Sequence, residues 1–261
     1  MNYVFCSSTD PGLARDNNED AVTFDEETGL GILADGMGGY NAGEVASGMA
    51  TTFIKSELSR WLSQAGRHAN GKEVRRAMEI CVENANRSIF NAANSNAHYT
   101  GMGTTLVIGV FQNDRLMLGH IGDSRCYRLR NGQLQQISKD HSLLQEQMDA
   151  GLITPEQAAT SSNKNLVTRA LGVEDAVLLE INEHNVEALD LFLLCSDGLS
   201  DMVGDAQIAE VLNAPVALEQ KAVNLIGLAN AHGGRDNISV LLAQASGTTK
   251  KRGLMARFLG K

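Results

Sequence analysis

The chain has little of what marks a disulfide-rich, zinc-ribbon or membrane protein. Its four cysteines (Cys6, Cys81, Cys126 and Cys195) are scattered and form no Cys-x-x-Cys pair, which argues against zinc ribbons and disulfide frameworks. No apolar run approaches the length of a membrane span, and the N-terminus lacks the basic and apolar character of a signal sequence. We therefore expect a cytoplasmic protein with no membrane span.

Basic residues are also few. The 22 lysines and arginines are outnumbered by 31 aspartates and glutamates, which gives a formal net charge of −9. This balance argues against a nucleic-acid-binding surface, because a phosphate backbone is bound by clustered basic residues. With 261 residues and 43% hydrophobic content, the chain can bury a full core as one large domain or two small ones.

Four apolar runs, far apart in the chain, each adjoin an aspartate that has a glycine or asparagine beside it. Carboxylates that are brought together repel one another, so they normally gather around cations. The repeated pattern therefore predicts strands that deliver carboxylates to one place, and a hydrolase with bound divalent metal is the first hypothesis. The four stretches are Leu30–Gly39 with Asp35, Leu116–Arg125 with Asp123, Leu189–Gly198 with Asp197, and Gly233–Val240 with Asp236.

Two loops near the N-terminus are candidates for ligand binding. Three glycines follow Asp35 within four positions, a density that indicates close backbone approach to a ligand, and the Gly36 carbonyl could bind a hard cation. The earlier loop around Arg15 is rich in charge, and composition alone favours a solvated surface loop. In the functional alternative, Arg15 holds a phosphate while Glu19 and Asp20 orient metal-bound water.

The spacing of apolar residues predicts strands and helices in separate blocks, which is typical of an α+β protein with sheets packed together and helices outside. We expect Val177–Asn185 and Ala188–Cys195 to pair as strands, and Ile153–Asn165 to be a mobile surface segment. The predicted helices are Glu44–Ser63, Lys72–Asn94, Ser142–Gly151, Asp205–Asn213 and Ala217–Ala231. The other predicted strands are Val4–Ser8, Ala21–Phe24, Leu30–Ala34, Thr104–Phe111, Arg115–Ile121, Arg125–Arg130, Gln133–Ile137 and Ile238–Ala243.

Taken in chain order, these motifs resemble the metal-dependent protein phosphatase family known as PPM or protein phosphatase 2C, in its compact bacterial form. The resemblance covers about Val4 to Ala243, and the ordered set is far more specific than any one motif. The matching residues are Gly12-x-x-Arg15-x-x-Asn18-Glu19-Asp20, Asp35-Gly36-Met37-Gly38-Gly39, Gly43-Glu44-x-Ala46-Ser47, Gly103-Thr104-Thr105, Gly122-Asp123-Ser124-Arg125, Asp140-His141-Ser142, Ser196-Asp197-Gly198 and Gly234-x-Asp236-Asn237.

The resemblance implies a four-layer α-β-β-α sandwich and hydrolysis of phosphoserine and phosphothreonine in proteins by a metal-activated water. It implies two core Mn²⁺ or Mg²⁺ ions, with a third, more loosely held ion in some members. By position, Asp35 would bridge the core ions with the Gly36 carbonyl beside it, Asp197 and Asp236 would ligate one of them, and Asp123 would hold the third. Glu19 and Asp20 would act through bound water, and Arg15 would bind the phosphate. Oxygen ligands suit these hard cations better than Zn²⁺.

The same resemblance gives the expected organisation and partners. A single phosphatase domain would span residues 1–246, with a flap segment at about 142–165 that borders the active site and contributes to substrate choice. Residues 247–261 form a basic tail, for which a solvated end is favoured over a weak amphipathic contact with an anionic surface or partner. The expected partners are phosphorylated proteins and an opposing bacterial Ser/Thr kinase with its targets, and we expect a monomer.

The chain departs from the family at one catalytic position. Family members often carry a histidine near the glycine-rich turn, at the position of Met37 or of Tyr40, and this chain has neither. A tyrosine with a pKa of about 10 is a poor acid, so metal-bound water is the remaining proton donor. Among the other histidines, we expect His141 to brace the structure and His120 to be a hydrogen-bonded core residue.

Three competing hypotheses make different predictions. Cys81 and Arg87 have the Cys-x₅-Arg spacing of cysteine phosphatases, but the predicted helix and Glu83 argue against a phosphate-binding loop there. A phosphoprotein-binding module without turnover would have no reason to keep four converging carboxylates, although the missing histidine favours it. A phosphatase of small metabolites would have the same metal site, and only the resemblance favours protein substrates.

Overall fold

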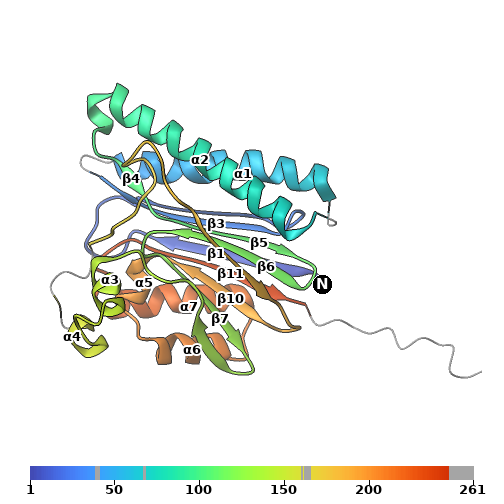
Figure 1. The fold of residues 1–261 in the computed structure, drawn as a ribbon. Helices are drawn as coiled ribbons and strands as arrows, with labels where there is room; N and C mark the ends of the chain where they lie inside the picture. The colour runs from blue at the N-terminus through green and yellow to red at the C-terminus, as the bar shows by residue number, and fades with distance from the viewer. Residues whose placement is uncertain (39–41, 67–68, 160, 162–165, 247–261) are drawn as a thin grey trace, which may run out of the picture.

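A computed structural model gives the structure of residues 1–38, 42–66, 69–159, 161 and 166–246. Two antiparallel sheets pack face to face, and helices cover the outer face of each sheet (Figure 1). This arrangement confirms the predicted four-layer α+β sandwich.

The first sheet has six strands. Its hydrogen-bonded order is β2-β3-β5-β6-β9, and β4 pairs with the end of β3. The strands are β2 (Asp20–Asp25), β3 (Leu30–Met37), β4 (Gly103–Thr104), β5 (Leu106–Gln112), β6 (Arg115–Ile121) and β9 (Glu180–Asn185).

The second sheet has five strands in the order β1-β11-β10-β7-β8. They are β1 (Tyr3–Asp10), β7 (Arg125–Arg130), β8 (Gln133–Gln136), β10 (Leu191–Cys195) and β11 (Ile238–Ala245). The turn between β7 and β8 is an Asn131-Gly132 hairpin, in which both residues have positive φ angles of 52° and 78°. This is the backbone that a two-residue turn needs to match the twist of its strands.

Two long antiparallel helices, α1 (Ala42–Ala65) and α2 (Gly71–Ser95), cover the six-stranded sheet (Figure 1). A capping box begins α2, because the Asn70 side chain accepts from the Glu73 amide while the Glu73 carboxylate accepts from the Asn70 amide. The five-stranded sheet is covered by α5 (Asp197–Ser200), α6 (Asp205–Asn213) and α7 (Leu218–Ala231). The remaining short helices are η2 (Ala97–Tyr99), α3 (Leu143–Asp149) and α4 (Pro155–Ala159).

Each pair of neighbouring layers encloses a hydrophobic core. Between the sheets, Phe111 packs edge-on against both Phe5 and Phe192, with ring centroids 5.5 and 5.4 Å apart. Such tilted contacts are the favoured packing of aromatic rings. Because the strands are held on both faces, their ends form a rigid frame for the loops that follow them.

The structure corrects three local predictions. The pairing of the strands at 177–185 and 188–195 is wrong, because β9 pairs with β6 in one sheet and β10 pairs with β7 and β11 in the other. A tight turn in which Leu189 has a φ of 74° carries the chain between the sheets. Residues 155–159, expected to be irregular, form α4. Finally, β3 continues through Met37, because Gly36 pairs with Thr104 of β4.

The sheet registers place several chain connections at one end of the sandwich, away from the N-terminus (Figure 1). Asp10 pairs with Ile238, Asp20 with Asp35, and Arg125 with Cys195. The ends of β3, β6 and β10 and the start of β11 therefore lie together. These are the places where the four aspartates of the sequence motifs are found.

Candidate metal and phosphate site

The predicted acidic residues meet in one cavity at this end of the sandwich. Its volume is about 220 Å³, and Glu19, Asp35, Asp123, Asp197 and Asp236 line it. The sixth acid, Asp20, lies opposite Asp35 in the β2–β3 ladder. Arg15, Gly36 and Met37 also line the cavity. The structure thus brings together all eight residues predicted for the site, while their individual roles stay predictions.

The carboxylates of this cluster disfavour one another's ionisation. Burial, followed by the charges of Asp20, Asp197, Asp123 and Asp236, raises the pKa of Asp35 well above its ordinary value. Burial and the charges of Asp123, Asp201, Asp236 and Asp20 do the same to the pKa of Asp197. Repulsion of this kind is what bound cations relieve.

Two further acids of the cluster also have raised pKa values. Burial, followed by the charge of Asp140, raises the pKa of Asp123 to about 6. Burial also raises the pKa of Asp20 to about 6, although a hydrogen bond from Ser196 opposes the shift. The Ser196 hydroxyl donates to Asp20 Oδ2 at 2.8 Å, whereas Asp20 Oδ1 is buried with no hydrogen-bond partner among the described residues.

These observations fit a site for hard divalent cations. An unpartnered buried carboxylate oxygen needs a donor or a cation, since leaving it bare is unfavourable. Most candidate metal ligands that line the cavity are oxygen atoms, from five carboxylates, the Thr105 hydroxyl and the backbone of Gly36, and the lining named for it includes no histidine or cysteine. Oxygen ligands are typical of Mg²⁺ and Mn²⁺ sites.

The glycines after Asp35 have a structural reason as well. A Cβ on Gly36 would lie 2.2 Å from the Gly43 carbonyl oxygen and 2.5 Å from that of Glu19, so no side chain fits there. The Glu19 carbonyl accepts from the Gly36 amide at 3.1 Å and from the Ser47 hydroxyl of α1 at 2.6 Å. The close approach predicted from the glycines is therefore, at Gly36, an approach to the chain's own backbone. Gly39 and Tyr40 lie outside the described residues.

Arg15 lies at the mouth of the cavity, with 52% of its side chain exposed. Its Nη2 donates to Asp236 Oδ2 at 2.8 Å. The loop that carries it is packed against the chain before β11: the Leu13 amide donates to the Gly234 carbonyl at 2.7 Å. A Cβ on Gly12 would lie 2.3 Å from the Asp236 carbonyl oxygen. The guanidinium is thus held over the acidic cluster.

Several positioning residues were not identified from the sequence. Asn237 joins the N-terminal loop to β11, because its side chain accepts from the Glu19 amide and donates to the Pro11 and Asn17 carbonyls, all within 3.0 Å. Thr105 Oγ1 accepts from the Asp35 amide at 3.0 Å. Asn237 and Thr105 stand inside sequence motifs, but their partners are about 70 to 220 residues away.

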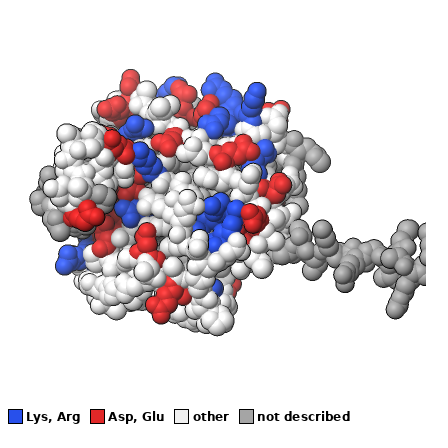
Figure 2. Space-filling view, turned by 60° about the horizontal axis from the view of Figure 1, so that its bottom comes forward, with Lys and Arg blue, Asp and Glu red and all other residues white. Residues whose placement is uncertain are grey.

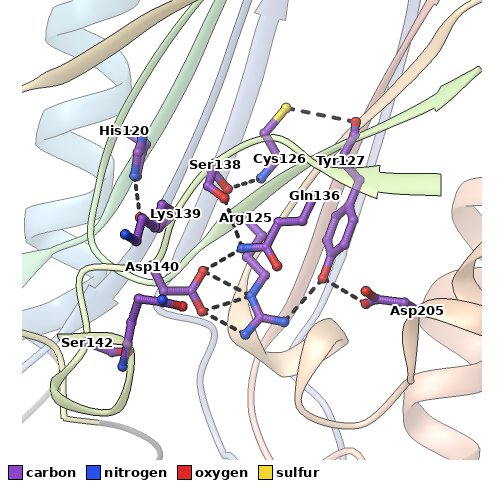
Figure 3. A network of polar contacts seen from close by, with 11 residues as sticks. His120, Arg125, Cys126, Tyr127, Gln136, Ser138, Lys139, Asp140, Ser142 and Asp205 are labelled. Atoms are coloured by element: carbon purple, nitrogen blue, oxygen red, sulfur yellow. Dashed lines mark hydrogen bonds and ion pairs between the residues drawn. The ribbon is translucent and has the colours of Figure 1, made fainter. Parts of the chain in front are cut away.

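A second polar network supports the loop that carries Asp123 (Figure 3). Arg125 of β7 binds Asp140 through Nε at 3.0 Å and Nη2 at 2.7 Å, and its Nη1 donates to the Tyr127 hydroxyl at 3.2 Å. The Tyr127 hydroxyl donates in turn to Asp205 at the start of α6. The network therefore ties β7, the segment before α3 and α6 together beside the cavity.

We expect Arg125→Met to lower the free energy of unfolding by about 3 kcal/mol, because it leaves Asp140 without its cation. The Arg125 and Asp140 side chains are only 26% and 10% exposed. Arg87→Met is the matched control, since the Arg87–Glu83 pair on α2 is 60% and 53% exposed and should contribute less than about 1 kcal/mol. Urea denaturation of both variants measures the difference, and equal losses would contradict a structural role for the Arg125 pair.

Two histidines lie beside this network. His120 and His141 stack with ring centroids 4.6 Å apart, and together with Glu180 they place candidate ligand atoms within 4.8 Å of one another, a grouping that could hold a metal ion. Hydrogen bonds within the chain engage three of their four ring nitrogens. His120 is buried and bonds the Lys139 carbonyl through Nε2 at 2.7 Å. His141 Nδ1 accepts from the Gly122 amide, which leaves its Nε2–H to donate to Glu180. These bonds agree with the bracing role expected for His141, whereas His120 is a core residue whose Nδ1 is buried with no hydrogen-bond partner among the described residues.

The Cys-x₅-Arg spacing of Cys81 and Arg87 occurs by chance within helix α2. Cys81 is buried in α2, and burial raises the pKa of its thiol to about 12, so it is not a nucleophilic thiolate at neutral pH. Arg87 instead pairs with Glu83 one helical turn away, at 2.9 Å.

Charged side chains of both signs are interspersed on the face shown in Figure 2. On that face no broad surface of one charge is formed by the described residues. No helix among them is long and apolar enough to cross a bilayer.

Comparison with known proteins agrees with the site. The family model described as protein phosphatase 2C matches residues 14–224. The serine/threonine phosphatase stp of Listeria monocytogenes is 38% identical over 247 residues, which cover 94% of this chain and 96% of that protein. The chain therefore belongs to the protein phosphatase 2C family, whose members are metal-dependent serine/threonine protein phosphatases.

Solved structures agree with this assignment. The crystal structure of the Mycobacterium tuberculosis serine/threonine phosphatase PstP/Ppp matches with a TM-score of 0.86 at 38% identity, covering 94% of this chain and all of that one. The catalytic domain of the phosphatase PstP in complex with two manganese ions matches with a TM-score of 0.82 at 38% identity, covering 94% of this chain and 99% of that one.

Proposed function

We propose that this protein hydrolyses phosphoserine and phosphothreonine in proteins at a centre of two Mn²⁺ or Mg²⁺ ions, with a third ion near Asp123. The observation that carries the proposal is the convergence of the predicted acids on one cavity, where burial and mutual repulsion raise the pKa of Asp35 and Asp197. The two manganese ions in the PstP catalytic domain support the metal and its number.

Each residue has a proposed role. Asp35 would hold both core ions with the Gly36 carbonyl as a further ligand, and Asp197 and Asp236 would hold one of them. Glu19 and Asp20 act through ordered water, and Asp123 holds the third ion. These roles agree with the five carboxylates that line the cavity and with the unpartnered oxygen of Asp20.

When bound, ions of this kind lower the pKa of water and stabilise negative charge on phosphoryl oxygens. The chain itself supplies binding and orientation. Arg15 is half exposed at the mouth of the cavity, where its planar guanidinium can donate two parallel hydrogen bonds to a phosphate. Its contact with Asp236 holds the side chain in place before substrate arrives, which lowers the entropy lost on binding.

We further infer that residues 1–246 are the catalytic domain, that 142–165 act as its flap and that 247–261 are a tail. We infer a monomer in the cytoplasm that opposes a Ser/Thr kinase. All four cysteines are unpaired and buried, which suits a reducing compartment.

The direct test is a metal-dependent assay on chelator-treated protein. We expect Mn²⁺ to restore hydrolysis of a phosphothreonine peptide, and the peptide to be a much better substrate than phosphorylated sugars. Cys81→Ser should keep full activity, because its thiol is buried in α2 and away from the acidic cavity.

The outcomes separate the alternatives. Activity that survives EDTA but not Cys81→Ser would favour a cysteine phosphatase, and a preference for sugar phosphates would favour a metabolite phosphatase. Tight binding of the phosphopeptide without turnover would indicate a binding module.

A further inference from the structure

A second hollow adjoins the catalytic cavity. It has a volume of about 660 Å³ and is lined by Met37 and by residues of the segment 167–178. Met37 and Val167 line both hollows, so the two lie side by side with these side chains between them. A volume of this size is typical of ligand-binding clefts. We call this second hollow the flanking subsite.

The wall of the flanking subsite is fixed by the fold. Asn86 of α2 is completely buried, and its Oδ1 accepts from the Gly172 amide at 2.7 Å while its Nδ2 donates to the Glu174 carbonyl at 2.9 Å. Leu171 forms two backbone hydrogen bonds with Thr104 of β4, at 2.8 and 3.0 Å. A wall held from two elements is preorganised, so a ligand does not have to order it.

Apolar side chains are exposed to solvent in this lining. Val173 and Leu178 expose 56% and 74% of their surface, although both lie on this fixed segment. Val177 and Met37 add apolar surface, and Arg169 and Glu174 are the charged residues of the described lining. Exposed apolar side chains that gather beside a catalytic cavity indicate a surface that a ligand covers.

We propose that the flanking subsite binds the residues next to the phosphorylated residue of a protein substrate and selects apolar side chains there. The proposal rests on the proposed function, because it requires the phosphoryl group to occupy the acidic cavity. The shared side chains Met37 and Val167 indicate the occupant: a polypeptide whose phosphoresidue fills the acidic cavity can pass over them into the adjoining hollow. An extended chain advances about 3.3 Å per residue, so positions roughly two to four residues away reach the apolar wall.

Two phosphothreonine peptides and p-nitrophenyl phosphate test this with Mn²⁺ present. The peptides differ only at positions two to four residues from the phosphothreonine, which are leucine in one and glutamine in the other. We expect the kcat/KM of the leucine peptide to exceed that of the glutamine peptide by about 10-fold, the lower end of what a small apolar contact gives. Leu178→Asp and Val173→Asp should each remove most of this preference through KM, and Leu178→Met should keep it.

Val223→Asp is the matched control. Val223 is an equally exposed valine (55%) on α7, in the opposite helical layer, so its variant should keep the peptide preference. Equal rates for the two peptides in the unaltered protein, or an undiminished preference in both aspartate variants, would overturn the flanking subsite. If the unaltered protein hydrolyses neither peptide nor p-nitrophenyl phosphate, the proposed function fails and the subsite fails with it.

Discussion

Asp35→Asn is expected to reduce Mn²⁺-dependent hydrolysis of a phosphothreonine peptide by at least about 10²-fold, the loss seen when one strong electrostatic contact to a reaction is removed. The substitution keeps the shape of the side chain, and the Asp35 amide and carbonyl keep their bonds to Thr105 and Thr104. What is lost is the charge at the centre of the acidic cluster. The variant should also bind Mn²⁺ more weakly in a calorimetric titration.

A second property of this variant is independent of turnover. Burial, followed by the charges of four other aspartates, raises the pKa of Asp35, so replacing its carboxyl by an amide removes an ionisation that the metal-free protein disfavours. Chelated Asp35→Asn should therefore melt at a higher temperature than the chelated unaltered protein, while gaining less from added Mn²⁺.

The matched control is Asp114→Asn in the β5–β6 turn. Asp114 is exposed and lies at the other end of the sandwich, and the control replaces the same carboxyl group by an amide there. Hydrolysis, Mn²⁺ binding and stability should therefore stay close to those of the unaltered protein. Full metal-dependent activity in Asp35→Asn would contradict the assignment of this cavity as the metal centre.

The convergence of the acids could be read from the sequence because each one adjoins an apolar run. Strand ends in a packed sandwich meet at an edge, and the registers that pair Asp20 with Asp35 and Arg125 with Cys195 produce that meeting. The family motifs then added the order and the ligand types. Local sequence patterns were sufficient to predict the strand ends and the acids beside them, because each pattern involves only a few consecutive residues.

Strand pairing between distant segments could not be read in the same way. The strands at 180–185 and 191–195 look like a hairpin, since few residues separate them. The two strands nevertheless differ in burial. β9 is polar (EINEHN) and lies at the edge of the first sheet, whereas β10, with all five residues buried, is a central strand of the other sheet. Burial on both faces, which depends on the whole fold, outweighed the short connection.

The supporting polar residues were hidden for a related reason. Asn237 bonds a loop more than 200 residues away, and Asn86 holds a segment 86 to 89 residues later in the chain. The sequence around a single asparagine, in a helix or beside an aspartate, contains no pattern that indicates a distant hydrogen-bond partner. Only the folded backbone identifies the carbonyl and amide groups that these side chains satisfy.

In the chelated protein, the free energy of unfolding is expected to fall as the pH rises from 5 to 8. The folded protein raises the pKa of Asp20 and of Asp123 to about 6, against about 3.9 for an unfolded aspartate. When folding raises the pKa of an acid, the group stabilises the folded protein fully at a pH below its pKa in the unfolded chain. This stabilisation is lost as the pH rises past its pKa in the folded protein. Between pH 5 and pH 8, Asp123 alone should account for about 1.4 kcal/mol, because about one pH unit of its titration lies in this range.

Other groups act in the opposite direction. Burial lowers the pKa of His141 and of His184, so their contribution to stability is lost as the pH falls. The Asp123→Asn variant separates the effect of the carboxyl group from that of the histidines. It keeps both histidines and lacks the pH-dependent contribution of Asp123 to stability. Its stability should decline less between pH 5 and pH 8, measured by urea denaturation in EDTA.

Added Mn²⁺ should reverse the decline. Ions stabilise a folded protein in proportion to the logarithm of their concentration over the dissociation constant, and they bind carboxylates that have lost their protons. The stabilisation by Mn²⁺ should therefore be largest near pH 8 and small near pH 5, where protons neutralise the same acids. A chelated protein that instead grows more stable from pH 5 to pH 8 would show that these carboxylates do not repel one another. The cavity would then lack the charge that cations are needed to balance.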